Sequence, residues 1–315
     1  MRPPAPRGSP DVAVLRPWPV RVRVPATSAN LGPGYDSLGL ALRRHDEITV
    51  VAGDRLRVEV LGEGADTLPR DETHLVVSSM RRAFAAWGVD GGGLHLRCVN
   101  DLPHGRGLGS SAAAIVAGMV AARALLSDRS GIDDEELLDL AAGVEGHPDN
   151  VAACLFGGLT VAWREEARVR CTRLEPHPDV RPVLFVPDAV MSTGQARDLL
   201  PARVPHADAA FTAARAALLV VALTQRPELL LSATEDRLHQ PYRAASMPAA
   251  ADLVRRLRAA RVPAVVSGAG PAVLAFPGRQ DVSGLAGPGW DVRRVGVDRR
   301  GAQVLREEGP EEAAE

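Results

Sequence analysis

Residues 103–113 read PHGRGLGSSAA, a glycine-rich turn followed by the expected start of a helix. Glycines let the backbone approach an anion and reach positive φ angles, and the free N–H groups at a helix start attract negative charge. Ser110 and Ser111 add hydroxyl groups that can cap the helix or reach a phosphate oxygen or Mg²⁺. The segment therefore predicts a phosphate site, although a glycine turn alone is as typical of a tight turn before a buried helix.

Two other kinds of phosphate loop are excluded by the residues present. A P-loop needs a lysine that reaches the phosphates, and all 37 basic residues of this chain are arginine. The same absence excludes Schiff-base chemistry. The dinucleotide-binding pattern needs G-x-G-x-x-G, whereas Gly105, Gly107 and Gly109 run G-x-G-x-G into two serines.

The run at 103–113 resembles the central motif of the GHMP small-molecule kinases, in which P-x-G-x-G-L-G-S-S-A-A wraps the phosphates of a nucleotide. The resemblance implies that ATP is the cofactor. It assigns the nucleotide contacts to Pro103, Gly105, Arg106, Gly107, Leu108, Gly109, Ser110, Ser111 and Ala112.

The length and composition indicate a globular protein. With 315 residues, the chain suffices for one large or two ordinary domains. A formal net charge of −2 gives no reason to expect a nucleic-acid or membrane partner. The longest apolar run, residues 216–223, is short for a membrane span and the amino terminus lacks a signal pattern, so we expect a cytoplasmic location. Cys98, Cys154 and Cys171 lie far apart, which favours reduced, buried thiols over disulfides or zinc.

The periodicity of apolar residues predicts strands and helices without strict alternation, which indicates an α+β fold. The predicted strands are residues 20–24, 47–51, 56–60, 94–99, 155–163, 183–186, 264–266 and 272–276. The predicted helices are residues 74–87, 111–126, 134–143, 207–223 and 249–261. We expect a disordered leader over 1–18, an ATP-binding domain over 19–167, a second domain over 168–305 and a disordered tail over 306–315.

Residues 25–42, PATSANLGPGYDSLGLAL, are rich in glycine and small polar residues. Loops of this kind on a rigid scaffold often bind ligands, although Asn30 and Asp36 can equally close ordinary Asx turns. The run resembles the amino-terminal signature of the homoserine kinases within the GHMP family, with Tyr35 where Phe is usual. The resemblance implies that Asn30 and Asp36 bind the substrate.

Residues 145–150, EGHPDN, place two carboxylates, an imidazole and an amide directly after a helix. Carboxylates suit Mg²⁺, whereas a capping Asp beside a solvated His is the non-functional alternative. The run resembles the E-G-H-P-D-N run of the homoserine kinases, and by that resemblance Glu145 completes the Mg²⁺ shell with Ser111. Asp139, six residues earlier, is a competing metal carboxylate.

The same resemblance directs His147, Asp149 and Asn150 toward the substrate, with Asp149 and Asn150 as the catalytic pair. Two mechanisms stay open, because phosphoryl transfer through a loose transition state needs little early deprotonation. In one, Asp149 accepts the proton of the substrate hydroxyl as a general base. In the other, Asn150 only orients the hydroxyl and the phosphate takes the proton itself.

Two further segments, MSTGQAR at 191–197 and QPYR at 240–243, each place an arginine beside a short turn. A guanidinium binds a carboxylate bidentately, although a solvated surface position is the commoner one in an arginine-rich chain. The segments resemble the S-T-x-x-A-R and E-P-x-R elements of the homoserine kinases, with Gln in place of the usual acid. This resemblance assigns the substrate side to Thr193, Arg197 and Arg243.

The glycine turn SGAGP at 267–271, which includes Gly268 as a further substrate-side residue, resembles the third family motif. Together the motifs imply a two-domain GHMP kinase fold, with an amino-terminal domain like ribosomal protein S5 domain 2 and a ferredoxin-like carboxy-terminal domain. They imply Mg²⁺-dependent phosphorylation of L-homoserine by ATP, a step toward threonine, in a homodimer. The alternatives are a GHMP kinase acting on mevalonate, a sugar or an isoprenoid intermediate, and a non-catalytic relative that binds a metabolite.

Overall fold

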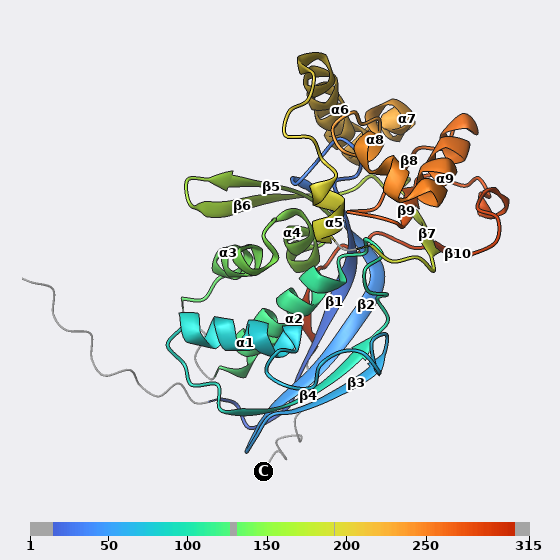
Figure 1. Ribbon diagram of the computed structural model, residues 1–315. Coiled ribbons are helices and arrows are strands. Elements are labelled where there is room, and N and C mark those ends of the chain that lie inside the picture. The colour runs from blue at the N-terminus through green and yellow to red at the C-terminus, as the bar shows by residue number, and fades with distance from the viewer. Residues whose placement is uncertain (1–14, 127–130, 192, 306–315) are drawn as a thin grey trace, which may run out of the picture.

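The computed structural model describes residues 15–126, 131–191 and 193–305, which form two β-sheets with helices packed against them (Figure 1). The tail predicted for 306–315 and most of the predicted leader lie outside the described residues. Leu15 and Arg16 are described, and the backbone N–H of Arg16 donates to the carbonyl of Leu125 at 2.7 Å. Residues 15–18, at the end of the predicted leader, are thus among the described residues.

The first sheet has seven strands within the described residues. They are β1 (Val20–Ala29), β2 (Leu38–Gly53), β3 (Arg57–Gly62), β4 (Gly93–Asn100), β5 (Leu159–Glu165), β6 (Arg168–Leu174) and β11 (Gln303–Leu305). The order is β11-β1-β2-β4-β3, and the β5–β6 hairpin joins through β2. Only the β3–β4 pair is parallel among these strands, and β4 lies between β2 and β3, so these two consecutive strands do not form a hairpin.

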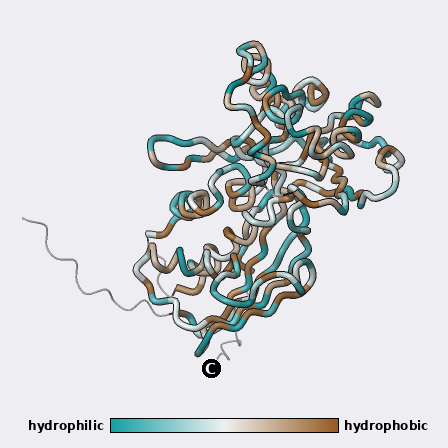
Figure 2. The backbone as a smooth tube through the Cα atoms, viewed as in Figure 1, coloured by the Kyte–Doolittle hydropathy of each residue, from teal (hydrophilic) through white to brown (hydrophobic). Residues whose placement is uncertain are grey.

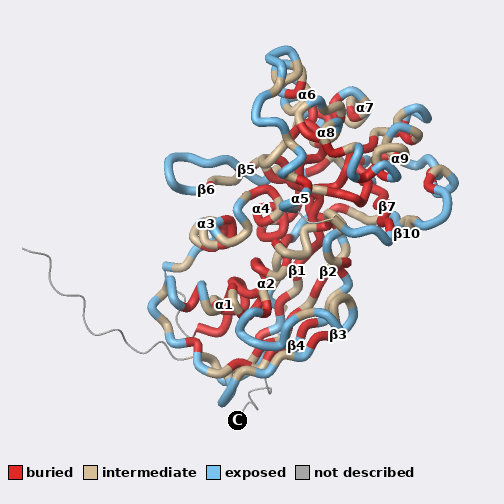
Figure 3. The backbone as a smooth tube through the Cα atoms, in the orientation of Figure 1, coloured by how far each residue is buried: buried red, intermediate tan, exposed pale blue. Residues whose placement is uncertain are grey.

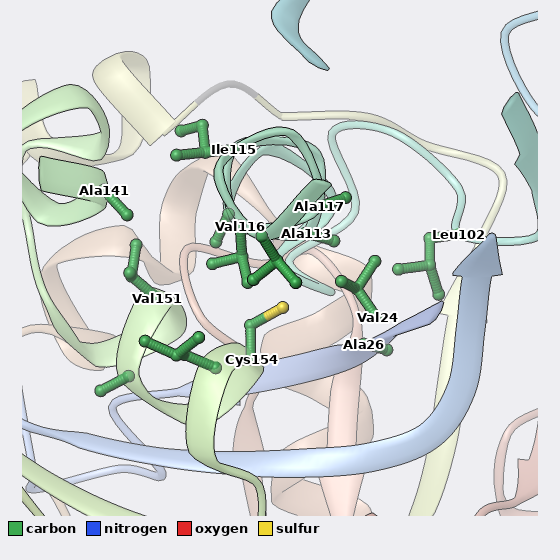
Figure 4. Packing of buried hydrophobic residues seen from close by; sticks show 14 of the residues in the cluster. Val24, Ala26, Leu102, Ala113, Ile115, Val116, Ala117, Ala141, Val151 and Cys154 are labelled. Atoms are coloured by element: carbon green, nitrogen blue, oxygen red, sulfur yellow. The ribbon is translucent and has the colours of Figure 1, made fainter. Parts of the chain in front are cut away.

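Four helices cover one face of this sheet (Figure 1). They are α1 (Leu75–Ala86), α2 (Ser110–Leu125), α3 (Asp134–Glu145) and α4 (Asp149–Phe156). Helix α2 lies at the centre and packs against β1, α1, α3 and α4, as the cluster around Val116 and Cys154 shows in Figure 4. Small residues permit this close packing: a Cβ atom at Gly118 would lie 2.5 Å from the carbonyl oxygen of Val76.

The second sheet has the order β10-β7-β9-β8, from β7 (Val183–Pro187), β8 (Ala264–Val266), β9 (Val273–Ala275) and β10 (Trp290–Arg294). Its helices are α5 (Thr193–Asp198), α6 (His206–Thr224), α7 (Leu230–Ala233), α8 (Gln240–Arg243) and α9 (Pro248–Ala259). Between β9 and β10 the chain forms only the 3₁₀ turn η3 (Ser283–Leu285). A ferredoxin-like fold has a helix at this place in its β-α-β-β-α-β order. Two sheets with helices confirm the predicted α+β class.

Most predicted elements form, but helices α4, α5, α7 and α8 were not predicted, and three further points differ. Leu155 and Phe156, predicted to begin a strand, end helix α4, and the strand starts at Leu159 after two glycines with positive φ. Strand β6 pairs with β5, so it belongs to the first sheet although the sequence places it after the predicted boundary at 167. Strand β11 returns to the first sheet and pairs with β1. The domain limits themselves stay predictions.

Strand β4 alternates between more and less buried residues, whereas β7 is buried along its whole length. Figures 2 and 3 show hydropathy and burial along the chain. The three cysteines are free, with Cys98 and Cys154 buried and Cys171 half-buried. In the described part of the chain, helix α6 alone is long and apolar enough to cross a membrane, by length and composition. One such helix is weak evidence, because core helices of soluble proteins pass the same test. The absence of a membrane partner stays a prediction.

Candidate active site

The glycine-rich turn adopts the left-handed backbone that its residues predict. Gly105, Gly107 and Gly109 have φ angles of 66°, 75° and 68°. A Cβ atom at Gly107 would lie 2.2 Å from the carbonyl oxygen of Ser267, and one at Gly109 would lie 1.9 Å from Thr27 Oγ1. Glycine is therefore required at both positions. Gly109 caps α2, so the turn leads directly into the free N–H groups of the helix start.

Segments from both sheets hold this turn in place. The Oγ of Ser267 donates to the Gly107 carbonyl at 2.6 Å, and the N–H of Thr27 donates to the Leu108 carbonyl at 3.0 Å. The N–H of Met191 donates to the Gly105 carbonyl at 2.8 Å. These bonds fix the turn before any ligand binds, which reduces the ordering that a phosphate group would have to impose.

A cavity of about 190 Å³ opens in front of the turn and collects most of the predicted site residues. Its lining includes Asn30, Asp36, Gly105, Gly107, Leu108, Gly109, Ser110, Ser111, Glu145, His147, Asp149, Asn150, Arg197, Arg243 and Gly268. Four predicted residues are not among the lining residues: Pro103, Arg106, Ala112 and Thr193. Pro103 and Ala112 are buried, and Arg106 Nη2 donates to the carbonyl of Asp188 at 3.2 Å. Thr193 begins α5, and its side chain lies outside the described part of the structure.

Ser111 and Glu145 lie side by side at one end of the cavity. The Oγ of Ser111 donates to Glu145 Oε1 at 2.7 Å. Burial raises the pKa of Glu145, and the hydrogen bond from Ser111 opposes that rise. Two oxygen ligands at this spacing fit Mg²⁺, which prefers a few protein oxygens together with water and phosphate oxygens. The competing carboxylate, Asp139, accepts instead from the N–H of Val169 at 2.9 Å and does not line the cavity.

The remaining EGHPDN residues form a chain of hydrogen bonds on the cavity wall. His147 Nδ1 donates to Asp149 Oδ1 at 3.1 Å, and the Asp149 side chain is only 2% exposed. Burial lowers the pKa of His147, but the Asp149 and Glu145 carboxylates together outweigh burial and the pKa is raised overall. Thr27 Oγ1 donates to Asn150 Oδ1 at 2.7 Å. Because that bond uses the amide oxygen of Asn150, its NH₂ group is the end available to a ligand.

Asp36 and Arg197 form an ion pair across the mouth of the cavity. Arg197 Nη2 donates to Asp36 Oδ1 at 2.6 Å and Nη1 donates to the Tyr35 hydroxyl at 3.1 Å. Asn30 holds the loop in this shape, since its Oδ1 accepts from the Asp36 N–H at 2.9 Å and its Nδ2 donates to the Gly268 carbonyl at 3.0 Å. Both side chains of the pair remain about a third exposed, at 37% and 35%.

Arg243 is a buried guanidinium, 4% exposed, that lines the same cavity. Its Nε donates to the Ala196 carbonyl at 2.9 Å and its Nη1 donates to His239 Nδ1 at 3.1 Å. His239 accepts there because its Nε2–H donates to the Gly32 carbonyl at 2.7 Å, and burial lowers its pKa. The Arg243 guanidinium also lies 5.5 Å from the centre of the Tyr35 ring.

A second cavity, of about 260 Å³, adjoins the first through Ser110 and Ser111. Its walls are mainly apolar and come from β1, β2, the start of α1 and the first two turns of α2. His74 lines it, is 3% exposed, and has no hydrogen-bond partner at either ring nitrogen among the described residues. Burial lowers the pKa of His74, so the ring is neutral and offers one donor and one acceptor.

Sequence reasoning did not assign roles to four residues that line these cavities or bond to residues that do. Thr27 and Tyr35 stand inside the 25–42 run, and His239 immediately precedes the QPYR segment, so their positions gave a weak signal. His74 had none, because a lone histidine at the start of a predicted helix carries no motif. Gln240, at the position of the usual acid, accepts from the N–H of Val266 at 2.8 Å and thereby supports the strand before the 267–271 turn.

Comparisons with known proteins agree with this geometry. Residues 74–158 match the family described as GHMP kinases N terminal domain. Homoserine kinase of Streptomyces coelicolor is 57% identical over 291 residues, which cover 91% of this chain and 94% of that protein. Homoserine kinase of Clavibacter michiganensis is 51% identical and covers 90% and 93%. The crystal structure of homoserine kinase from Cytophaga hutchinsonii is 27% identical, covers 91% and 97%, and superposes with a TM-score of 0.81. The chain therefore belongs to the homoserine kinases of the GHMP kinase family.

Proposed function

We propose that this chain transfers the γ-phosphoryl group of ATP to the hydroxyl of L-homoserine, giving ADP and O-phospho-L-homoserine on the way to threonine. ATP use and small-molecule substrates follow from the family. The observation that supports the substrate is the Asp36–Arg197 ion pair, which lies in the same cavity as the glycine-rich turn and the EGHPDN residues.

An amino acid matches that ion pair because it carries both opposite charges. Its ammonium group can replace Arg197 at Asp36 while its carboxylate replaces Asp36 at Arg197, so no charge is left without a partner. Arg243, fixed by His239 and Ala196, supplies a second guanidinium for the carboxylate. Mevalonate and sugars have no ammonium group, and opening the pair for them would leave Asp36 unpaired.

The phosphates of the nucleotide occupy the first cavity, and its base occupies the adjoining one. The phosphates lie on the turn from Gly105 to Ser111 and the start of α2, where the N–H groups and the helix dipole favour negative charge. The base enters the apolar cavity beside His74, whose unpaired ring nitrogens suit the polar edge of a purine. Ser111 Oγ and the Glu145 carboxylate would hold Mg²⁺, which would neutralise phosphate charge.

The substrate hydroxyl meets Asp149 and Asn150 at the inner wall. His147 holds Asp149 and Thr27 holds Asn150, so both groups are oriented before the substrate arrives. Asp149 accepts the hydroxyl proton if the reaction uses a general base. In the direct alternative, the Asn150 NH₂ group holds the hydroxyl oxygen and the proton passes to the phosphate. His147 holds Asp149 in either mechanism.

Release of ADP in a coupled assay with homoserine, mevalonate and galactose tests the function. We expect turnover with homoserine alone, and only when Mg²⁺ is present. Turnover with mevalonate or galactose in its place would assign the chain to another GHMP activity. Homoserine binding in calorimetry without ADP release would identify a non-catalytic relative.

We further propose a cytoplasmic homodimer, on the basis of the family resemblance alone. Light scattering coupled to size exclusion distinguishes a 33.3 kDa monomer from the dimer.

A further inference from the structure

A third cavity, of about 880 Å³, lies where the chain passes between the two sheets. It is formed by β1, β2, residues 178–182 before β7, and residues 294–300 after β10. The backbone joins these segments, since the N–H of Arg43 donates to the Gly296 carbonyl at 2.8 Å and the N–H of Asp298 to the Ala41 carbonyl at 2.9 Å. This cavity shares no lining residue with the active-site cavity.

The lining of this cleft is strongly basic. Among its side chains are one histidine, His45, one carboxylate, Asp298, and six arginines: Arg23, Arg43, Arg181, Arg294, Arg299 and Arg300. The whole chain has a formal net charge of −2, so this concentration of positive charge is local rather than a reflection of composition. A concave surface focuses such a field and favours anions.

The single carboxylate is already fully engaged. Asp298 Oδ2 accepts from His45 Nε2 at 2.7 Å, and Oδ1 accepts from the N–H groups of Arg300 and Gly301 at 2.9 and 2.8 Å. Burial would raise the pKa of Asp298, but these hydrogen bonds lower it overall. The carboxylate therefore stays ionised in its present bonds and does not reach toward the arginines.

Two of the six arginines have carboxylates from outside the cleft. Arg299 pairs with Glu175, and Arg181 lies 4.0 Å from Asp179, which is a loose contact. Two more donate their hydrogen bonds to neutral groups: Arg23 to Gln303 Oε1 at 2.8 Å, and Arg294 to the carbonyls of Gly278 and Gln280. Arg294 also interacts electrostatically with Asp281, which lies outside the cleft lining.

Within the described residues, the guanidinium groups of Arg43 and Arg300 have neither a hydrogen bond nor a carboxylate within 4.0 Å. The Arg43 guanidinium lies directly over Gly296, where a Cβ atom would come within 2.0 Å of its Nε. Because Gly296 has no side chain, the Arg43 guanidinium can lie at this place in the cleft. Like charges gathered without counter-charges repel each other, and a bound anion relieves that repulsion.

We propose that this cleft binds a small polyanion that carries at least two phosphate or carboxylate groups, held by Arg43 and Arg300 with support from Arg23 and Arg294. A planar guanidinium binds either group through paired N–H donors. The lining contains no Phe, Tyr or Trp, so the cleft offers no stacking surface for a nucleobase and the anionic groups supply the recognition. Its volume is in the range of small-ligand sites.

Tripolyphosphate, titrated calorimetrically in magnesium-free buffer with the active site saturated by a non-hydrolysable ATP analogue, tests the proposal. Citrate in a parallel titration tells a phosphate ligand from a carboxylate ligand. We expect one equivalent of at least one of them to bind, with affinity that falls as salt is added. The double variant Arg43→Gln/Arg300→Gln should weaken binding at least tenfold while its turnover of homoserine stays normal.

The matched control is Arg82→Gln/Arg203→Gln, which removes the same charge from two exposed arginines outside the cleft. Its affinity should equal that of the unchanged chain. Equal affinity of all three proteins, or no binding of either anion, would overturn the proposal. The deciding measurement is the affinity for the anion, so that result would not bear on the proposed kinase activity, which is tested by ADP release.

Discussion

At the scale of single residues, the geometry assigns a positioning role to Thr27, a residue without an obvious chemical function. Its hydroxyl joins Asn150 across 123 positions of sequence and its N–H supports the glycine-rich turn. Removal of the hydroxyl leaves the amide of Asn150 free to rotate, so that either its oxygen or its NH₂ group can face the substrate.

We predict that Thr27→Val lowers kcat for homoserine by about tenfold, the effect of losing roughly one neutral hydrogen bond that orients a reacting group. The KM for ATP should change little, because the backbone bond to Leu108 remains. Thr27→Ser, which keeps the hydroxyl, is the control and should retain most activity. Normal kcat in the valine variant would mean that Asn150 has no part in catalysis.

The metal ligands can be separated by a second pair of variants. Glu145→Gln should reduce kcat strongly and be partly rescued by high Mg²⁺, because the amide keeps the bond from Ser111 but loses the charge. Asp139→Asn should behave almost as the unchanged enzyme, since its oxygen can still accept from Val169. Steady-state rates measured over a series of Mg²⁺ concentrations test which carboxylate is the metal ligand. An inactive Asp139→Asn variant together with an unaffected Glu145→Gln variant would assign the metal to Asp139.

Several site residues could be predicted because short motifs keep chemistry-bearing residues adjacent in sequence. The EGHPDN run is an example: Glu145 and Asp149 both line the cavity. The hydrogen bonds that Thr27 and His239 donate, and the one that Tyr35 accepts from Arg197, could not be predicted, because they join residues that only the folded chain brings together. His74 was missed because its significance comes from burial without a partner, which sequence does not encode locally.

At the scale of elements, the glycine-rich turn and α2 form one unit whose shape depends on the absence of side chains. The turn passes so close to β1 and to Ser267 that no Cβ atom fits at Gly107 or Gly109. Gly88, at the end of α1, provides a natural comparison: its φ of 67° nearly equals the 68° of Gly109, but no atom lies within 4 Å of its would-be Cβ.

We predict that Gly109→Ala abolishes measurable ATP binding, whereas Gly88→Ala does not change it. Both variants take on the same left-handed strain, on the order of 1–2 kcal/mol, so both should lose similar stability from this source. Only Gly109→Ala must also push Thr27 away from the turn. Nucleotide titrations and thermal melts of both variants provide the test, and equal ATP affinities would contradict it.

Asp46 anchors the other side of the same unit. Its Oδ1 accepts from the N–H groups of Asp101 and Leu102, at 2.7 and 2.9 Å, just before the glycine-rich turn. Burial raises its pKa from 3.8 to about 6 despite these two bonds. Between those pH values the folded chain keeps a proton that the unfolded chain loses, so stability falls as pH rises through this window.

We predict that Asp46→Asn, which keeps the acceptor oxygen but cannot ionise, becomes more stable relative to the unchanged chain as pH rises. The gain should be about 1 kcal/mol larger at pH 7.5 than at pH 5. Urea denaturation at both pH values measures it. Asp66→Asn, at an exposed loop position, should show no such difference, and a pH-independent gain for Asp46→Asn would contradict the prediction.

At the scale of the whole molecule, the two sheets are connected by the chain twice, once before β7 and once after β10. Local periodicity predicted most helices and the α+β class because each amphipathic segment carries its own signal. It could not predict that β11 returns to β1, or that β4 lies between β2 and β3, because strand pairing over long separations is set by packing of the complete sheet. At Leu155 and Phe156 an apolar run was ambiguous between helix and strand.

The Asp36–Arg197 pair also has a consequence for how the KM of homoserine, compared with that of ATP, depends on ionic strength. Homoserine is a zwitterion without net charge, and the Asp36–Arg197 pair, with which its two charged groups pair, is also neutral overall. The long-range electrostatic field that salt screens therefore contributes little to homoserine binding. ATP arrives as a polyanion at a helix start and loses that attraction as salt is added. We predict that raising NaCl from 20 to 300 mM increases the KM for ATP severalfold and changes the KM for homoserine less than twofold. Steady-state titrations of each substrate at both salt concentrations measure this, and a parallel rise in both constants would mean that homoserine binds without exchanging partners with the pair.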